Sequence, residues 1–238
     1  MKTLVNTMVI VAFFTAFGFC QSQEQKEQES ASTERDRVKE SGEVLKQIVE
    51  MDKGVPKGLL KDSKCVIVLP SVKKVAVVIG GTYGRGVMSC RTGADYKGPW
   101  SAPIMMASSG GNIGLQIGGE ATDFVIIVLN DEGAKRLITN KVKLGADASV
   151  AAGPVGRTAE ASTNASMRAE MLSYSRSRGV FGGVSLSGAT LRPDGSANDK
   201  LYGKEIKPQQ IVAGQVAMPP EAEPLITALE ESQQSAKK

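Results

Sequence analysis

The sequence predicts an α+β fold with N-terminal helices, a glycine-rich antiparallel β-core (a curved sheet or barrel-like), one inserted helix and a C-terminal helix. Three observations predict it. Helical periodicity appears near both ends of the chain and in one short internal stretch. Between them, continuous apolar runs and period-two alternation are typical of strands. Eleven glycines between Gly80 and Glu120 favour bent strands or close backbone approaches over helices.

Residues 1–20 have the pattern of a secretory signal. Lys2 precedes an apolar run from Met8 to Phe19, after which the chain turns abruptly polar. The run is shorter than the roughly 20 apolar residues that a membrane span needs. We therefore expect export to the periplasm or cell envelope. A lipoprotein acylated at Cys20, with an atypical Phe19 before it, and an uncleaved anchor are the alternatives.

Polar, Gln/Glu-rich residues after the signal predict a flexible tether. Apolar residues then recur at three- and four-residue spacings, as in Val38, Leu45 and Ile48, and predict a helix over 33–52. Pro56 suits the start of a short second helix over Lys57–Asp62. The expected organisation is a signal over 1–20, a tether over 21–32, a domain over 33–204 and a C-terminal helical extension over 205–238.

The strands are expected in the middle of the chain. Apolar or alternating stretches predict them at 65–69, 72–79, 113–117, 124–129 and 184–190. One helix, over 131–139, interrupts them, with Asn130 or Asp131 as its N-cap. A last helix is expected over 221–234, opened by two prolines.

The rare residue types exclude several kinds of chemistry. The chain contains no histidine, which excludes Ser-His-Asp and Cys-His catalysis and every His-ligated metal centre. Three cysteines are too few and too scattered for a disulfide scaffold or a structural zinc site, and no cofactor is expected. Cys65 and Cys90 either pair in an oxidising compartment or are two small buried apolar residues.

Two motifs resemble catalytic or ligand sites. The stretch from Gly80 to Gly86 resembles a phosphate loop, but it lacks the Gly-Lys-Ser/Thr ending and a following helix, so a hairpin turn or bent strand is favoured. Glu120 and Asp123, with Asp95 near the single tryptophan, offer carboxylates for acid–base work or a hard cation. Acids at a strand entry more often accept hydrogen bonds from local backbone. The sequence therefore predicts a protein that is not an enzyme.

Charge is distributed unevenly along the chain. Between Lys53 and Lys97 there are nine basic residues, and only Asp62 and Asp95 oppose them. Such a block either lies on an anionic surface or forms a solvated rim. The residues expected to bind lipid are Lys57, Lys61, Lys64, Lys73, Lys74, Arg85 and Arg91. With few aromatic residues and a net charge of only +4, nucleic acid is not an expected partner.

Several segments together resemble the SYLF domain, also called the Ysc84 or DUF500 domain, over about residues 36–204. The most specific is the run from Tyr174 to Ser185, which reads YSRSRGVFGGVS. The others are Pro56–Leu60 with Lys64–Leu69, Gly84–Val87, Arg91, Trp100–Pro103, Gly118–Asn130, Leu144–Arg157 and Asn198–Gly203.

The resemblance implies a non-enzymatic domain that binds acidic phospholipids, phosphoinositides in the eukaryotic members, at a membrane surface. Membrane binding in those members is attributed to a basic N-terminal helix, whereas acids outnumber bases over 33–52 here. For an exported chain, phosphatidylglycerol or cardiolipin is the expected lipid, and the basic residues between 57 and 91 are the expected contact. The alternative is an interaction protein that holds a protein partner, since some fungal members bind actin. A hydrolase working through Glu120 and Asp123 is the third hypothesis.

Overall fold

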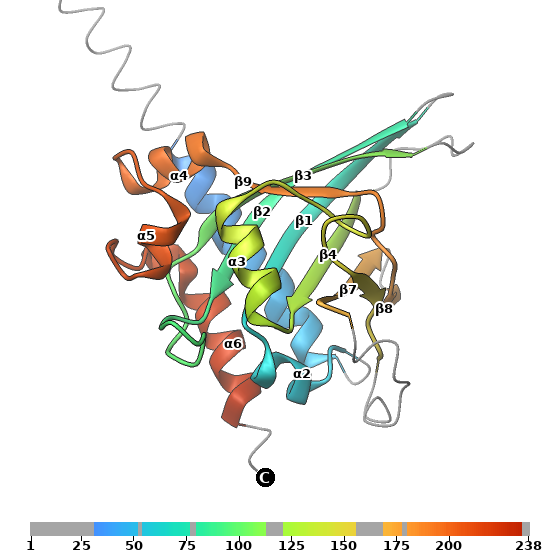
Figure 1. Ribbon diagram of the computed structural model, residues 1–238, viewed down its shortest axis with the longest axis horizontal. Coiled ribbons are helices and arrows are strands. Elements are labelled where there is room, and N and C mark those ends of the chain that lie inside the picture. Colours follow the sequence, from blue (N-terminus) through green and yellow to red (C-terminus); the bar gives the residue numbers. More distant parts are fainter. Residues whose placement is uncertain are drawn as a thin grey trace, which may run out of the picture.

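A curled sheet of nine strands forms the centre of the molecule in a computed structural model, which describes residues 31–51, 54–76, 80–112, 121–155, 169–177 and 180–234 (Figure 1). The expected signal, most of the tether, the strand at 113–117 and Glu120 lie outside these residues. The strands are β1 Cys65–Ala76, β2 Gly80–Cys90, β3 Ile104–Asn112, β4 Ala121–Val128, β5 Val142–Lys143, β6 Val150–Ala152, β7 Met171–Ser177, β8 Val180–Gly183 and β9 Thr190–Pro193.

Helices flank the sheet, and along the chain they precede, interrupt and follow its strands. Residues 31–50 are helical. The later helices are α2 Lys57–Asp62, α3 Asp131–Thr139, α4 Gly195–Tyr202, α5 Pro208–Val212, the 3-10 turn η3 Pro220–Ala222 and α6 Glu223–Gln234. Helices, a mainly antiparallel sheet, the inserted α3 and the terminal α6 confirm the predicted α+β class.

The order of the strands explains the curl. It runs β5-β9-β3-β2-β1-β4-β7-β6, with β8 also paired to β7, and among the described pairs only β6–β7 is parallel. The two ends of this order, β5 and β6, are joined by the short connection 144–149. Because so short a segment links the outermost strands, the sheet must bend round toward itself.

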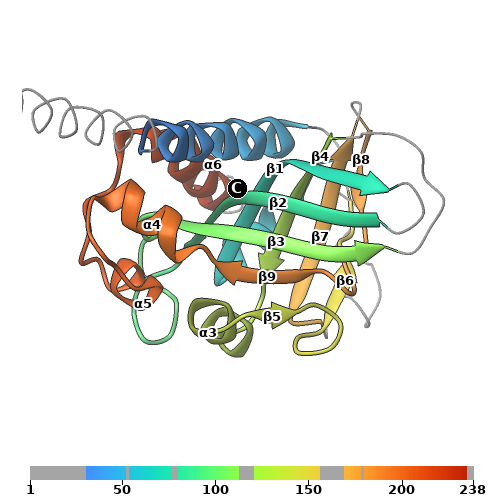
Figure 2. The same cartoon turned by 90° about the horizontal axis from the view of Figure 1, so that it is seen from above.

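Both faces of the sheet are buried, which requires apolar residues at successive positions of the central strands. In β1, Val66 and Val68 point into one core, while Cys65, Ile67 and Leu69 point into the other. The first core lies beneath the 31–50 helix and α6. The second lies on the side of α3 and α5 (Figure 2).

The 31–50 helix lies closely against the C-terminal segment. A Cβ atom added at Gly42 would lie 2.5 Å from the backbone nitrogen of Leu225, so only glycine allows this approach. Leu225 and Leu229 of α6 are fully buried in the core that contains Leu45 and Ile48. The segment expected as an extension after residue 204 therefore contributes to the central core.

One strand replaces the two that were expected at 65–69 and 72–79. β1 runs through the first and through 72–76 of the second, while 77–79 lie outside the described residues. A register shift between Leu69 and Val72 marks a bulge in it. Ser71 there has a φ of 50°, an uncommon value for a residue with a side chain. The bulge reverses which residues face which core, so Val72 joins Leu69 on the same face.

Other expectations have mixed outcomes. The 131–139 helix is confirmed, with the Asn130 side chain accepting a hydrogen bond from the Gly133 N–H as N-cap. The bent-strand interpretation of Gly80–Gly86 is confirmed by β2. The strand at 184–190 is wrong, because residues 184–189 form a turn-containing connection between β8 and β9. Neither α4 nor α5 was expected, since both are short and weakly periodic.

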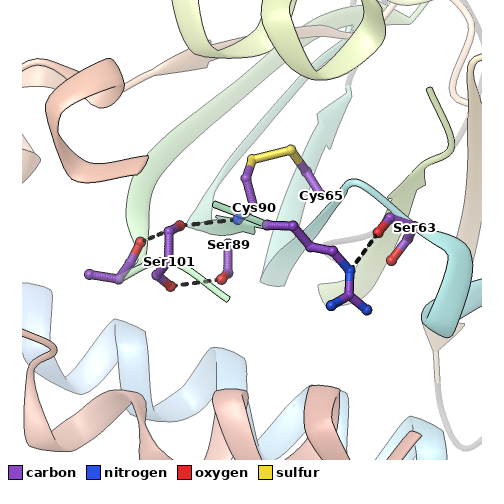
Figure 3. The surroundings of a disulfide bond; sticks show 7 residues. Ser63, Cys65, Ser89, Cys90 and Ser101 are labelled. Atoms are coloured by element: carbon purple, nitrogen blue, oxygen red, sulfur yellow. Dashed lines mark hydrogen bonds between the residues drawn. A yellow bond between two sulfur atoms is a disulfide. The ribbon is translucent and has the colours of Figure 1, made fainter. Parts of the chain in front are cut away.

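A disulfide joins the first residue of β1 to the last residue of β2. Cys65 and Cys90 are directly opposed in the register, and both side chains are fully buried (Figure 3). On the opposite face of β2, the Ser89 hydroxyl donates to the Ser101 carbonyl at 2.8 Å. Of the two alternatives left by the sequence, the structure has the disulfide.

Replacing both cysteines by alanine is expected to lower the free energy of unfolding by about 3 kcal/mol. The disulfide links residues 25 positions apart, and losing it restores conformational entropy to the unfolded chain. Urea unfolding of the variant and the parent measures the difference. Thiol counting on the denatured, unreduced protein is the control: two reactive thiols at 65 and 90, or equal stabilities, would contradict the assignment.

Candidate functional site

Of the seven basic residues expected to bind lipid, two lie next to each other on the surface without a described ion-pair partner. Lys57 and Lys61 are exposed on α2, one helical turn apart, and neither forms an ion pair with any residue the structure describes. The short helix is fixed from beneath by Leu60, which is fully buried.

Two further cations hold the base of α2 against the sheet. The Arg91 guanidinium donates to the carbonyls of Lys61 and Ser63 and lies 4.5 Å from the ring centroid of Trp100. Burial lowers the pKa of Arg91, but it remains a cation because the ordinary value is so high. Lys64 forms an ion pair with Asp131 at 3.1 Å. Both side chains thus have structural partners.

Arg85 belongs to a partly buried charge cluster. Its guanidinium lies 3.5 Å from a carboxylate oxygen of Asp194 and 4.0 Å from one of Glu34, and both acids are almost fully buried. Arg37 also pairs with Glu34, and burial lowers the pKa of Arg37. Since Glu34 lies on the 31–50 helix and Asp194 is the N-cap of α4, Arg85 connects both elements to β2.

The remaining two cations lie toward the other end of β1. Lys73 is exposed, and the side chain of Lys74 lies outside the described residues. The eight residue steps from Cys65 to Lys73 span about 26 Å of strand. The basic block of the sequence is therefore divided between two ends of the molecule, with Arg85 and Arg91 occupied by internal contacts.

The acid singled out for catalysis has a structural role. Asp123 accepts hydrogen bonds from two nitrogens of Arg176, at 2.7 and 3.0 Å, and one from the Ser71 backbone N–H at the bulge. Arg176 also donates to Gln47 of the 31–50 helix. Asp95 is exposed and pairs with Lys97, whose hydrogen bond lowers the pKa of Asp95. Glu40 also reaches this bulge, where its carboxylate accepts a hydrogen bond from the Ser71 hydroxyl at 3.2 Å.

Two of the motif segments meet around Tyr174. Its ring stacks on Phe181 with centroids 5.5 Å apart, and a Cβ added at Gly153 would lie 2.1 Å from a ring carbon. Burial raises the pKa of the Tyr174 phenol, whose hydroxyl has no partner among the described residues. A Cβ at Gly183 would in turn meet the Gly153 carbonyl. The glycines here allow this close packing.

A polar hollow that the sequence did not indicate lies where β3, β9 and β5 meet. It has a volume of about 560 Å³. Its lining comprises Ser109, Gly110, Lys141, Lys143, Asp147, Gly188 and Thr190. These residues are distant in the sequence, and only the pairing of β9 with β3 and β5 brings them together. No local pattern identifies such a site.

Neither a metal-ligand cluster nor a membrane-spanning helix occurs in the part of the chain that the structure describes. Across the described ranges, no cluster of three or more Cys, Asp or Glu side chains is suited to a metal ion. In the same part of the chain, no helix has the length and apolar character that crossing a membrane requires.

Comparisons with known proteins agree with the motif segments. A family model described as "Ysc84: Las17-binding protein actin regulator" matches residues 109–232. "Protein YSC84" of Saccharomyces cerevisiae is 36% identical over 206 residues, covering 82% of this chain and 43% of its own length. "LAS seventeen-binding protein 3" of the same organism is 35% identical over 187 residues, which is 77% of this chain and 40% of that protein.

A mammalian relative shows similar coverage. "SH3 domain-containing YSC84-like protein 1" of Homo sapiens is 30% identical over 203 residues, covering 82% of this chain and 58% of that protein. The chain spans less than two thirds of the length of each of these relatives.

Replacing Asp123 by asparagine is expected to lower the free energy of unfolding by about 2 kcal/mol, because it removes the charge from hydrogen bonds that two nitrogens of Arg176 donate in a largely buried setting. Thermal or urea unfolding measures the loss. The control is Asp95→Asn, at an exposed pair, which should leave stability unchanged. An Asp123 variant as stable as the parent would contradict the structural role.

Proposed function

The chain belongs to the Ysc84 (SYLF) family, and from that premise we propose that it is a non-catalytic binding module for a protein partner. The relatives' names support this proposal, since one is a Las17-binding protein and the family description is that of an actin regulator. The names describe whole proteins, and the chain matches only part of each of them.

The disposition of the charged groups is the structural observation that carries the proposal. Asp123, Arg85 and Arg91 have partners within the fold, so none of them is placed to transfer a proton or to attack a substrate. These charged side chains stabilise the fold, and the outer surface of the domain is left to recognise a partner. Export, which residues 1–20 predict, is part of this proposal, so the proposed partner is a protein of the cell envelope.

Cross-linking of the tagged protein in its own cells tests the proposal. A specific protein adduct is expected, and the partner identified in it should bind the purified protein in solution. An unrelated exported protein carrying the same tag is the control. The absence of any adduct beyond that control, or a partner that does not bind in solution, would contradict the proposal.

Binding to an anionic phospholipid surface is a second candidate, favoured by the two free cations of α2. Lys57 and Lys61 are exposed side by side, and each base near such a surface contributes about 1 kcal/mol. Lys64, Arg85 and Arg91 support it less than the sequence indicated, because their charges are engaged internally.

Co-sedimentation with vesicles tests this candidate. The protein should pellet with phosphatidylcholine vesicles that contain phosphatidylglycerol or cardiolipin, not with pure phosphatidylcholine, and salt should weaken the binding. Lys57→Glu with Lys61→Glu should abolish it, since the change reverses both free charges.

A matched double variant controls for net charge. Lys39→Glu with Lys46→Glu makes the same change on the 31–50 helix, where both lysines are 4.0 Å from glutamates, and it should retain most binding. Equal loss in both double variants, or no binding by the parent, would contradict lipid recognition through α2.

A further inference from the structure

Five directly opposed residues form a row across five strands of the sheet. The register pairs Lys73 of β1 with Tyr83 of β2, Tyr83 with Ser109 of β3, Ser109 with Thr190 of β9, and Thr190 with Lys143 of β5. Directly opposed residues in antiparallel strands point to the same face. We call this set, Lys73–Tyr83–Ser109–Thr190–Lys143, the cross-strand row.

The cross-strand row lies on the face that carries the 31–50 helix, but the hydrogen bonds and ion pairs that the structure describes between that helix and β1 or β2 fall beside it. Glu34 reaches Arg85, two residues from Tyr83, and Glu40 reaches Ser71, two residues from Lys73. In the row itself, Tyr83 is 51% exposed, an unusual value for an aromatic side chain on a sheet. Lys73, Ser109 and Lys143 are exposed and Thr190 is half-buried, so the whole row faces outward.

Cations dominate this surface. Period-two alternation puts Lys141 on the same side of the chain as Lys143, and Arg192 on the same side as Thr190. Together with Lys73 they make four exposed bases, and none of the four forms an ion pair with a described residue. Exposed carboxylates also border this surface, among them Asp147, whose side chain accepts a hydrogen bond from the Lys143 N–H, and Glu40.

The polar hollow where β3, β9 and β5 meet lies at the β5 end of the cross-strand row. Lys141, Lys143, Ser109 and Thr190 line it together with one acid, Asp147, so bases and hydroxyl side chains outnumber carboxylates around the depression. Neither hydroxyl has a hydrogen-bond partner within the described part of the chain. Ammonium and hydroxyl groups both donate hydrogen bonds to carboxylate oxygens, and charge-assisted bonds of this kind are the stronger ones.

We propose that the cross-strand row, with Lys141 and Arg192, docks an extended acidic segment of the protein partner. This inference rests on the proposed function and names its surface and the chemistry of its partner. Four interstrand steps span about 19 Å, the length of about six extended residues. An acidic side chain at one end of such a segment meets Lys73, and one at the other end enters the hollow between Lys141 and Lys143.

The curvature of the sheet favours a chain segment over a membrane as the occupant. Because the sheet bends round toward itself from β1 to β5, the outward direction of the side chains turns along the row (Figure 2). A flat bilayer touches such a convex surface along a narrow strip and cannot reach both ends at once. An extended segment follows the curve.

Fluorescence anisotropy with labelled deca-glutamate tests the docking surface. The protein should bind this peptide and not deca-glutamine, and salt should weaken the binding. Lys141→Gln with Lys143→Gln should raise the dissociation constant about fivefold, as expected for two exposed charge contacts. Ser109→Asp, which puts a negative charge in the middle of the row, should also weaken it.

Lys57→Gln with Lys61→Gln is the matched control, because it removes two exposed charges on α2, outside the row. It should leave the dissociation constant within twofold of the parent's. An equal loss in the control, or no binding of deca-glutamate by the parent, would overturn the docking surface. Binding to phosphatidylglycerol vesicles that is lost in Lys141→Gln with Lys143→Gln, without peptide binding, would assign the surface to membrane instead.

Photo-cross-linkers in place of Ser109 and Lys57 separate this inference from the proposed function. A protein adduct from position 109 in cells is the expected result. An adduct from position 57 alone would keep the protein partner and overturn this docking surface. No adduct from either position, together with none from the tagged parent, would count against the proposed function.

Discussion

Burial of both faces of the β1–β4 strand pair is the constraint on which the rest of the structure depends. Each strand must supply apolar side chains on its two sides, as Ile126 and Ile127 do for the two cores. A sheet of this kind needs cover on both faces, which the 31–50 helix and α6 provide on one and α3 with α5 on the other. A binding partner therefore has no access to the two covered faces of these strands and must bind elsewhere on the molecule.

The same constraint explains why conspicuous polar residues proved to be structural. Arg85, Arg91 and Arg176 each join a strand to a helix or to the segment beside it, and in doing so they donate to acids and carbonyls that are buried or partly buried. The motif glycines Gly86 and Gly153 lie where a side chain would collide with Val68 or Tyr174. The family motifs in this chain therefore include residues that stabilise the fold, and they do not by themselves identify the surface that binds a partner.

Local patterns predicted what depends on local physics. The α3 helix follows from its N-cap and spacing, and β4 from its apolar run. The bulge that fuses two expected strands into β1, and the glycine-rich pairing of β2 with β3, depend on partners far along the chain. The basic block does not form a single surface, because its members lie toward opposite ends of the twelve-residue strand β1. The cross-strand row was not predicted because it exists only through register.

Hydrogen–deuterium exchange of backbone amides tests the central claim, that a doubly buried sheet holds the helices in place. Slowest exchange is predicted in β1 over 65–69 and in β4 over 124–128, with the 31–50 helix exchanging faster, because it depends on the sheet for its buried face. Rapid exchange in both strands beside a protected 31–50 helix would contradict the account.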